Sequence, residues 1–373
     1  MASGDTLTVR ALNRATLARQ HLLARTDARV LDVVEHLVGL QAQAPLPPYF
    51  GLWSRIEGFT PDDLAERLLD RGVVRIAVMR STVHLVSARD CLPVRAVVQP
   101  SLERQLRGAS PYRPGLSGVD VEAVAAAARE IVDDEPRTAK QLGVELAKRW
   151  PDWDPEAMAF AARALLPLVQ VPPRGVWGRS GQPTLTTAQA WLGDDGARTP
   201  TVADVLTRYL GAFGPASAAD MQTWSGLTGL RAVVEEMRPR LRVFRDGSGR
   251  ELFDLPDAPR PDADTPAPVR LVAEFDNLLL SHADRTRVIS DEHRARLFGT
   301  RNAVFPGTVL VDGFVAGTWR LERKRGTATV TLTPYRRWRK RDAAAVEREA
   351  CRLLAFAAPD AEVTDVLTGH AVP

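Results

Sequence analysis

Two glutamines, Gln41 and Gln43, lie one residue apart in the stretch GLQAQAPLPPYFGLWSR, residues 39–55. They follow an amphipathic stretch, TDARVLDVVEHLVGL at residues 26–40, so we expect them where a helix ends and a loop begins. An amide has no useful pKa and acts only as a hydrogen-bond donor and acceptor. The pair can hold a water molecule or a substrate, or it can be an ordinary part of a surface loop.

Two carboxylates with the same spacing, Glu274 and Asp276, lie on a predicted strand, so both should face one side of it. Such a pair could act as acid and base in the hydrolysis of a glycosidic bond. In the alternative, one carboxylate caps a turn or pairs with Arg285 or Arg287. Both roles stay open from the sequence.

The histidines and cysteines show no metal-ligand spacing. The six histidines form no HExxH motif, and the two cysteines, Cys91 and Cys351, form no Cys/His pairing. The chain also lacks a GxSxG motif and the glycine-rich loops that bind nucleotide phosphates. We therefore expect neither a metal nor a cofactor.

The composition is that of an ordinary globular protein of two or three domains, with 373 residues, 45% hydrophobic and 25% charged. No apolar run is long enough for a membrane span, and no signal peptide is visible, so we expect a reduced, cytoplasmic protein. Of 49 basic residues only four are lysines, and the net charge is only +3. Arginine suits phosphate recognition, but GC-rich codon usage explains such a bias equally well, so only clustered arginines indicate DNA binding.

Two segments predict winged helix-turn-helix units, each with three helices followed by a hairpin. In the first, a helix beginning at Pro155, with Asp154 as its N-cap, precedes two short β-like pieces at residues 169–187. In the second, at residues 201–255, Ser217 can cap the middle helix, and DGSG at residues 246–249 predicts the hairpin turn. A less regular third copy, with a helix over residues 62–79 and a strand over 81–87, is expected in the first hundred residues.

The expected fold class is α+β, with tandem winged-helix units that form a concave protein and a β-rich C-terminal part. We place the units at residues 1–115, 116–198 and 199–259, and the β-rich domain with its closing helix at 260–373. The stretch RPDADTPAP at residues 260–268 is the best linker candidate.

Basic residues gather at three places that fit phosphate contacts with DNA. Arg174 and Arg179 lie on the predicted wing of the second unit, and Arg323 to Arg325 lie near a hairpin. A third cluster, YRRWRKR at residues 335–341, contributes Arg336, Arg337 and Arg339.

A histidine and an aspartate also lie where they could reach a DNA groove. His282 and Asp284, followed by Arg285, are expected at a hairpin tip. The alternative is that they form an Asx-type turn.

Four stretches together resemble the AlkZ/YcaQ-like bacterial DNA glycosylases, a family built from tandem winged helices. The four are HLVGLQAQAPLPPYFGLWSR (36–55), STVHLVSARD (81–90), EFDNLLLSHADRTRV (274–288) and VDGFVAGTW (311–319). The resemblance runs from about residue 10 to residue 365. Its most specific element is Gln-x-Gln, which matches the AlkZ branch, whereas the YcaQ branch carries an aspartate at the second polar position.

This resemblance implies that Gln41 and Gln43 are the catalytic residues. Tyr49, Trp53 and His84 could then line a substrate pocket, although Trp53 could equally fill the core and His84 could be a structural histidine. An alkyl group on N7 of guanine makes the base cationic, so the base leaves as a neutral molecule and needs no acid. Positioned amides then suffice to hold a water and stabilise an oxocarbenium-like sugar.

The sequence therefore predicts a monomeric, monofunctional DNA glycosylase that removes N7-alkylguanine lesions, including bulky natural-product adducts or crosslinks, from double-stranded DNA. Its role would be DNA repair or antibiotic self-resistance, without a membrane or a protein partner. The main alternative is a non-catalytic winged-helix regulator or drug-binding resistance protein, and a glycosidase using Glu274 and Asp276 is a further one.

Overall fold

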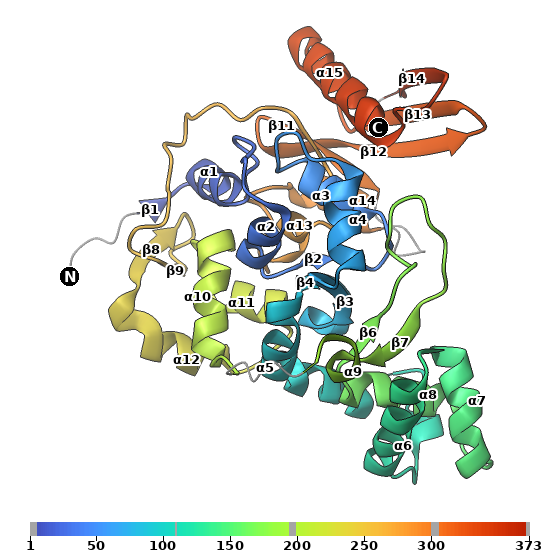
Figure 1. The fold of residues 1–373 in the computed structure, drawn as a ribbon. Helices are drawn as coiled ribbons and strands as arrows, with labels where there is room; N and C mark the ends of the chain where they lie inside the picture. Colours follow the sequence, from blue (N-terminus) through green and yellow to red (C-terminus); the bar gives the residue numbers. More distant parts are fainter. Residues whose placement is uncertain (1–5, 109, 194–198, 300–305, 371–373) are drawn as a thin grey trace.

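The computed structural model describes residues 6–108, 110–193, 199–299 and 306–370. In these residues the strands form three sheets surrounded by helices (Figure 1). One order of elements recurs three times: a helix, a short strand or bridge, two more helices and a β-hairpin. This order confirms the tandem winged-helix class.

In each copy the short strand or bridge pairs antiparallel with the last strand of the hairpin. The first copy contains α2 (Val30–His36), β2 (Leu40–Gln41), α3 (Pro47–Trp53), α4 (Pro61–Leu69), β3 (Val73–Ala77) and β4 (Val83–Ser87). The second contains α6 (Val121–Asp134), β5 (Arg137–Thr138), α7 (Ala139–Arg149), α8 (Pro155–Leu165), β6 (Leu168–Gln170) and β7 (Thr184–Thr187). The third contains α10 (Val202–Phe213), α11 (Ala218–Ser225), α12 (Leu230–Met237), β8 (Arg242–Asp246) and β9 (Glu251–Asp254), with an isolated bridge from Ala216 to Phe253 in place of the short strand.

The first two copies share one sheet, which crosses the boundary predicted between residues 115 and 116. Its strand order is β2-β4-β3-β6-β7-β5, and β3 joins β6 through the pairs Arg75–Gln170 and Ile76–Val169. The long helix α5 (Ala88–Arg107) and the short helix α9 (Ala188–Leu192) flank this sheet in the chain. The hairpin of the third copy forms a separate sheet with β1 (Thr6–Leu7).

The C-terminal part is a five-stranded sheet covered by a helix, α15 (Lys340–Ala357), at the top of Figure 1. Its strands, in spatial order, are β10 (Arg270–Val272), β11 (Gly307–Val311), β12 (Phe314–Lys324), β13 (Thr327–Pro334) and β14 (Val363–Thr368). The β-rich region expected over residues 269–290 is only partly right. After β10 the chain turns into α13 (Asn277–Leu280), then an irregular loop and α14 (Asp291–Phe298).

Local signals explain most helix starts. Asp154 accepts hydrogen bonds from the amides of Glu156 and Ala157, and Ser217 accepts one from Asp220, so both predicted N-caps are confirmed. The helix predicted over residues 62–79 is wrong in its second half. It ends at Leu69, and the apolar residues after Gly72 form the strand β3 because they pair with β4 and β6.

The first helix, α1 (Val9–Arg19), is fastened to the predicted linker. Two of its arginines donate to linker carbonyls, Arg10 to Ala263 and Arg14 to Thr265, and Arg19 donates to the carbonyl of Pro259, just before the linker. The linker therefore runs as an extended loop along α1, as Figure 1 shows. None of the helices in the described ranges is long and apolar enough to cross a membrane.

A cluster of aromatic side chains joins three parts of the fold. Phe50 on α3 lies 6.0 Å from Trp177 of the second copy, 5.4 Å from Trp319 on β12 and 6.1 Å from Phe356 on α15, between ring centroids. Trp53 stacks on Phe356 at 5.9 Å. Helix α3, which directly follows the two glutamines, is thus held from both sides.

A buried ion pair also fixes α3. Arg55, just after this helix, donates two hydrogen bonds of 2.8 Å to Asp276, and both side chains are almost fully buried. Arg55 also donates to Gln20 and to the carbonyl of Gly51. The carboxylate itself caps α13 by accepting from the amide of Leu278.

We expect Asp276→Asn to lower the free energy of unfolding by about 3 kcal/mol, because it leaves the Arg55 cation buried without a counter-charge. Asp32→Asn is the matched control, since Asp32 pairs with Arg29 on the exposed surface and should change stability by less than about 0.5 kcal/mol. Urea unfolding followed by circular dichroism measures both. Equal effects of the two substitutions would contradict this role of the buried pair.

Candidate active site

Gln41 lies on β2, directly opposite His84 on β4. The sharp entry into β2 depends on Gly39, whose φ is +93°. A Cβ at this position would come within 2.8 Å of a Val86 methyl carbon and 2.9 Å of the Leu85 carbonyl oxygen, so only glycine fits. Gln41 therefore lies on a short strand paired with the first hairpin, and Gln43 lies in the loop that follows this strand.

Both glutamine side-chain oxygens face hydrogen-bond donors from that same hairpin. Arg80 Nη2 donates to Gln41 Oε1 at 2.8 Å, and the backbone N–H of Val83 donates to Gln43 Oε1 at 3.2 Å. A guanidinium and a backbone amide can only donate, so neither glutamine can be flipped without placing N–H against N–H. The orientation of both amides follows from their partners, and each Nε2 group points away from the hairpin donors.

The two amides differ in exposure. Gln41 is 8% exposed, whereas Gln43 is an exposed residue. Ala42 between them is fully buried, and its amide donates to the Val83 carbonyl at 2.7 Å. Gln43 is thus accessible to solvent, whereas Gln41 is almost fully buried next to it.

A second arginine, Arg75 on β3, fixes the backbone of the motif. Its side chain is almost fully buried, and Nη2 donates to the Ala42 carbonyl at 2.7 Å while Nε donates to Gln170. Burial lowers the pKa of Arg75 to about 10, with Arg174 nearby acting in the same direction. The guanidinium remains a cation at neutral pH and holds the loop between the two glutamines and α3.

The three residues expected to line a substrate pocket are buried instead. Tyr49 and His84 are each 0% exposed, and Trp53 is 6% exposed. Tyr49 donates to the Gly175 carbonyl and accepts from the amide of Trp177, so it ties α3 to the second copy. Trp53 belongs to the aromatic cluster, and Arg25 lies over its ring. In this structure these side chains belong to the buried interior around the Gln-x-Gln motif.

The paired carboxylates lie beside Gln41 but not on a strand. Glu274 and Asp276 flank Phe275, whose φ of +57° breaks the extended chain after β10. Both line a cavity of about 10 Å³ together with Gln41 and Asn277, which is space for roughly one water molecule. Asp276 is held by Arg55 and cannot serve as a free acid or base. Burial raises the pKa of Glu274, and Arg320 partly opposes this shift.

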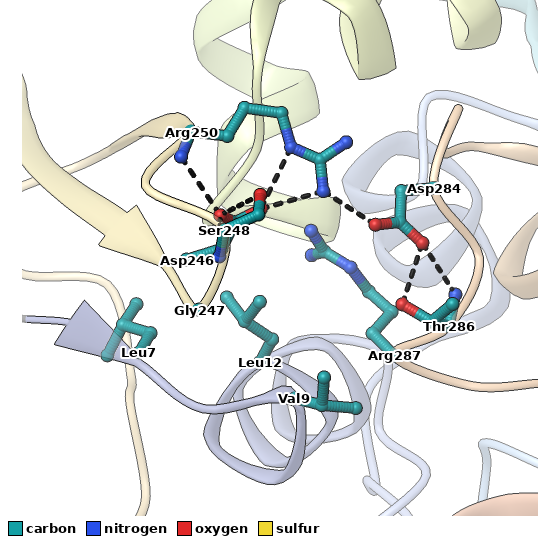
Figure 2. A pocket seen from close by; sticks show the side chains of 10 residues that line it. All are labelled: Leu7, Val9, Leu12, Asp246, Gly247, Ser248, Arg250, Asp284, Thr286 and Arg287. Carbon is teal, nitrogen blue, oxygen red and sulfur yellow. Dashed lines mark hydrogen bonds and ion pairs between the residues drawn. The ribbon is translucent and has the colours of Figure 1, made fainter.

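His282 and Asp284 lie in an irregular loop after α13, not at a hairpin tip. His282 is 1% exposed, its Nε2 lies 3.0 Å from the Phe213 carbonyl oxygen, and burial lowers its pKa to about 3. Asp284 forms the Asx-type turn by accepting from the amide of Thr286, and it also accepts from Arg250 of the third hairpin (Figure 2). Both residues therefore join the loop to the third copy, which leaves them unsuited to probing a DNA groove.

Some of the arginines predicted to contact DNA interact with other residues of the protein, and others are exposed on loops. Arg285 is half-buried and lies over the Phe298 ring at 4.7 Å, and Arg336 pairs with Glu292. Arg174 is half-buried and donates to the Gly181 carbonyl. The exposed ones on loops are Arg179 in the loop between β6 and β7, and Arg337 and Arg339 before α15.

Sequence reasoning missed Arg75 and Arg80. Arg75 had a signal, because a lone arginine inside the apolar run VVRIAV must be buried with partners if that run is a strand. Arg80 had none, since nothing in MRST shows that its side chain turns back toward Gln41.

Comparisons with known proteins find one family and a related protein of known structure. The family model of DNA glycosylase AlkZ-like proteins matches residues 34–356. An interstrand DNA cross-link repair glycosylase of Streptomyces sahachiroi is 25% identical over 356 residues, covering 90% of this chain and 93% of that protein. The solved structure of the S. sahachiroi DNA glycosylase AlkZ superposes with a TM-score of 0.80 at 22% identity, over 98% of this chain and 100% of that one.

The family match covers most of the chain and includes both glutamines, the first hairpin and the covering helix. The fold match extends over nearly all of the remainder. With its tandem winged helices and its Gln-x-Gln motif on the first of them, this chain belongs to the AlkZ-like family of DNA glycosylases.

Proposed function

We propose that this glycosylase hydrolyses the N-glycosidic bond of N7-alkylguanine in double-stranded DNA, with bulky adducts and crosslinks as its main lesions. The observation that carries the proposal is the pair of neutral amides, Gln41 and Gln43, each oriented by a donor from one hairpin. The S. sahachiroi relative, which is named for interstrand cross-link repair, supports crosslinks as substrates.

Neutral side chains suit a cationic base. Alkylation at N7 places a positive charge on guanine, so breaking the C1′–N9 bond moves this charge to the sugar and releases a neutral base. No group has to protonate the leaving base, which explains a site without a general acid. Normal nucleotides lack this charge, and the same site leaves them intact.

The orientation of the amides divides their roles toward the attacking water. Gln41 Oε1 is held by Arg80, so its Nε2–H groups are the part that faces substrate and can donate to the oxygen of a water. Gln43 Oε1 keeps one lone pair beyond its bond to Val83 and can accept a hydrogen from the same water. A water bracketed in this way keeps its second lone pair for C1′ of the sugar.

This division agrees with the pattern of the YcaQ branch of the family, which differs from this sequence in carrying an aspartate at the second position. An aspartate can accept but not donate when ionised, as the proposed role of Gln43 requires.

The exposed Arg179, Arg337 and Arg339 are the proposed contacts to DNA phosphates, because they are free to reach a ligand. Phosphate contacts of this kind position a protein on DNA without reading its sequence. We further propose that the protein acts as a monomer in the cytoplasm, in repair or in self-resistance to a DNA-alkylating antibiotic.

We expect Gln41→Ala and Gln43→Ala each to slow base release from an N7-alkylguanine duplex by roughly 100-fold, because each removes one of the two groups that position the water. Single-turnover kinetics with excess enzyme measure the rate constant, and fluorescence anisotropy measures DNA affinity, which should stay unchanged. The abasic strand should stay intact until alkali is added, since the nearest lysine in the sequence is Lys140.

Ser248→Ala is the control, because Ser248 lies in the turn of the third hairpin and donates only to Asp246. Base release by the parent and the control, with its loss in both glutamine variants, would establish the activity and its site. DNA binding without base release from simple or bulky adducts would instead support a non-catalytic regulator.

The leaving base should have to be cationic. We expect release of 7-methylguanine to exceed release of uracil or hypoxanthine from matched duplexes by at least about 1,000-fold, because neither glutamine can protonate a neutral leaving base. Chromatography of the freed bases measures both rates. Comparable release of uracil would show that a group in the site protonates the base, and Glu274 would become the first candidate.

A further inference from the structure

We propose that Arg80 and His84 are positioning residues for catalysis, which act together to fix the donor orientation of the Gln41 amide. The inference rests on the proposed roles of Gln41 and Gln43 and deepens them. Neither residue needs to touch the DNA for this role.

Arg80 reaches three acceptors from the turn between β3 and β4. Its Nη2 donates to Gln41 Oε1 at 2.8 Å and lies 3.5 Å from His84 Nε2, while Nη1 donates to the Trp224 carbonyl at 2.7 Å. The guanidinium is planar, so contacts at both of its ends fix its plane. A fixed plane in turn fixes the position of the Gln41 oxygen.

His84 must be a neutral acceptor at Nε2 for this arrangement. Its Nδ1 lies 2.9 Å from the Thr82 carbonyl oxygen, which can only accept, so Nδ1 carries the hydrogen and Nε2 carries the lone pair. Full burial, together with the Arg80 cation, lowers the pKa of His84 to about 3. The histidine is therefore neutral across the working pH range and lies directly across the strand pair from Gln41.

The turn that carries Arg80 is in an energetically unfavourable conformation. Arg80 and Ser81 both lie in the left-handed region, with φ values of +55° and +58°, and neither is glycine. Arg80 is half-buried and has no carboxylate partner among the residues described, and burial lowers its pKa to about 10. A buried cation without a counter-charge is unfavourable unless its hydrogen bonds are well formed.

The third copy stabilises this strained turn. The end of α11 packs against it so closely that a Cβ on Gly226 would lie 3.1 Å from the backbone of Arg80. The Trp224 carbonyl that accepts from Arg80 belongs to the same helix end. The orientation of Gln41 in the first copy therefore depends on contact with the third.

A purely structural role for Arg80 is the competing explanation, and Arg104 on α5 provides the control for it. Arg104 also donates to the end of α11, through the Gly226 carbonyl at 3.0 Å, but forms no bond with Gln41. Arg104→Ala should weaken the attachment of α11 as Arg80→Ala does, and should leave the Gln41 amide in place.

The test combines kinetics with a direct view of the amide. We expect Arg80→Ala to lower the single-turnover rate constant of base release by roughly 10- to 100-fold, with DNA affinity within about 3-fold of the parent. His84→Phe keeps a planar aromatic ring but removes the acceptor, so it should also slow release, by less. In protein labelled with ¹⁵N-glutamine, the Gln41 side-chain NH₂ signals, assigned by their loss in Gln41→Ala, should shift in both variants and stay in place in Arg104→Ala.

The outcomes separate this inference from the proposed function. If the parent releases no base, the glycosylase proposal is refuted. If the Gln41 NH₂ signals of Arg80→Ala and His84→Phe nevertheless differ from those of the parent, the positioning geometry still holds. Parent-like release and unmoved NH₂ signals in Arg80→Ala would overturn the inference. An equal loss of rate in Arg104→Ala, or a loss explained wholly by weaker DNA binding, would overturn it too.

Discussion

The site depends on one constraint, which is that both glutamine oxygens face groups that can only donate. Arg80 and the amide of Val83 belong to the same hairpin, and together they determine which end of each amide is available to substrate. An amide carries no charge and does not titrate, so its orientation alone determines whether it offers a donor or an acceptor to the substrate. The rest of the fold can be understood as the means of holding that hairpin and the strand beside it.

Buried arginines do much of this holding. Arg75 binds the backbone of the motif, Arg55 anchors the end of α3 through Asp276, and Arg19 pairs with Asp254 in the third copy. An arginine-rich composition suggests a nucleic-acid surface, yet in this chain several arginines work inside the protein. Arg75 joins the first copy to the second, Arg19 joins α1 to the third copy, and Arg55 joins the first copy to the C-terminal part. The planar guanidinium offers several donors in a fixed geometry, whereas the ammonium of lysine is a compact charge on a flexible chain.

The repeated fold was largely predictable, because its signals are local. The N-caps Asp154 and Ser217 and the DGSG turn act within a few residues, so the second and third copies could be recognised from sequence. The first copy was less regular because β3 is an apolar run whose strand character comes from pairing on both edges. The helix α13 was missed because the residues after β10 were expected to continue as a strand. The positive φ at Phe275 instead turns the chain out of the extended conformation before α13.

The proposed catalytic pair could be predicted from its residue types, its spacing and the family resemblance, whereas the residues that support it could not. Arg80 lies 39 residues from Gln41, and Trp224 lies a further 144 residues away from Arg80, so only the fold brings them together. Tyr49 and His84 were named as possible pocket residues under the family resemblance, with a structural role as the alternative for His84. Both side chains are buried in the structure. Burial is possible because the polar group of each has a backbone partner in place of water, the Gly175 carbonyl for Tyr49 and the Thr82 carbonyl for His84.

The most direct measurement of this account is base release by Gln41→Glu, which is isosteric with the parent and can still bind Arg80 through its oxygens. The substitution replaces the Nε2–H donors that we assign to the attacking water with an oxygen that only accepts when ionised, and it adds a negative charge beside Arg80. The account predicts that the single-turnover rate falls to that of Gln41→Ala while DNA binding and folding persist. A rate close to the parent's would contradict it, because an oxygen would then be the working atom at this position.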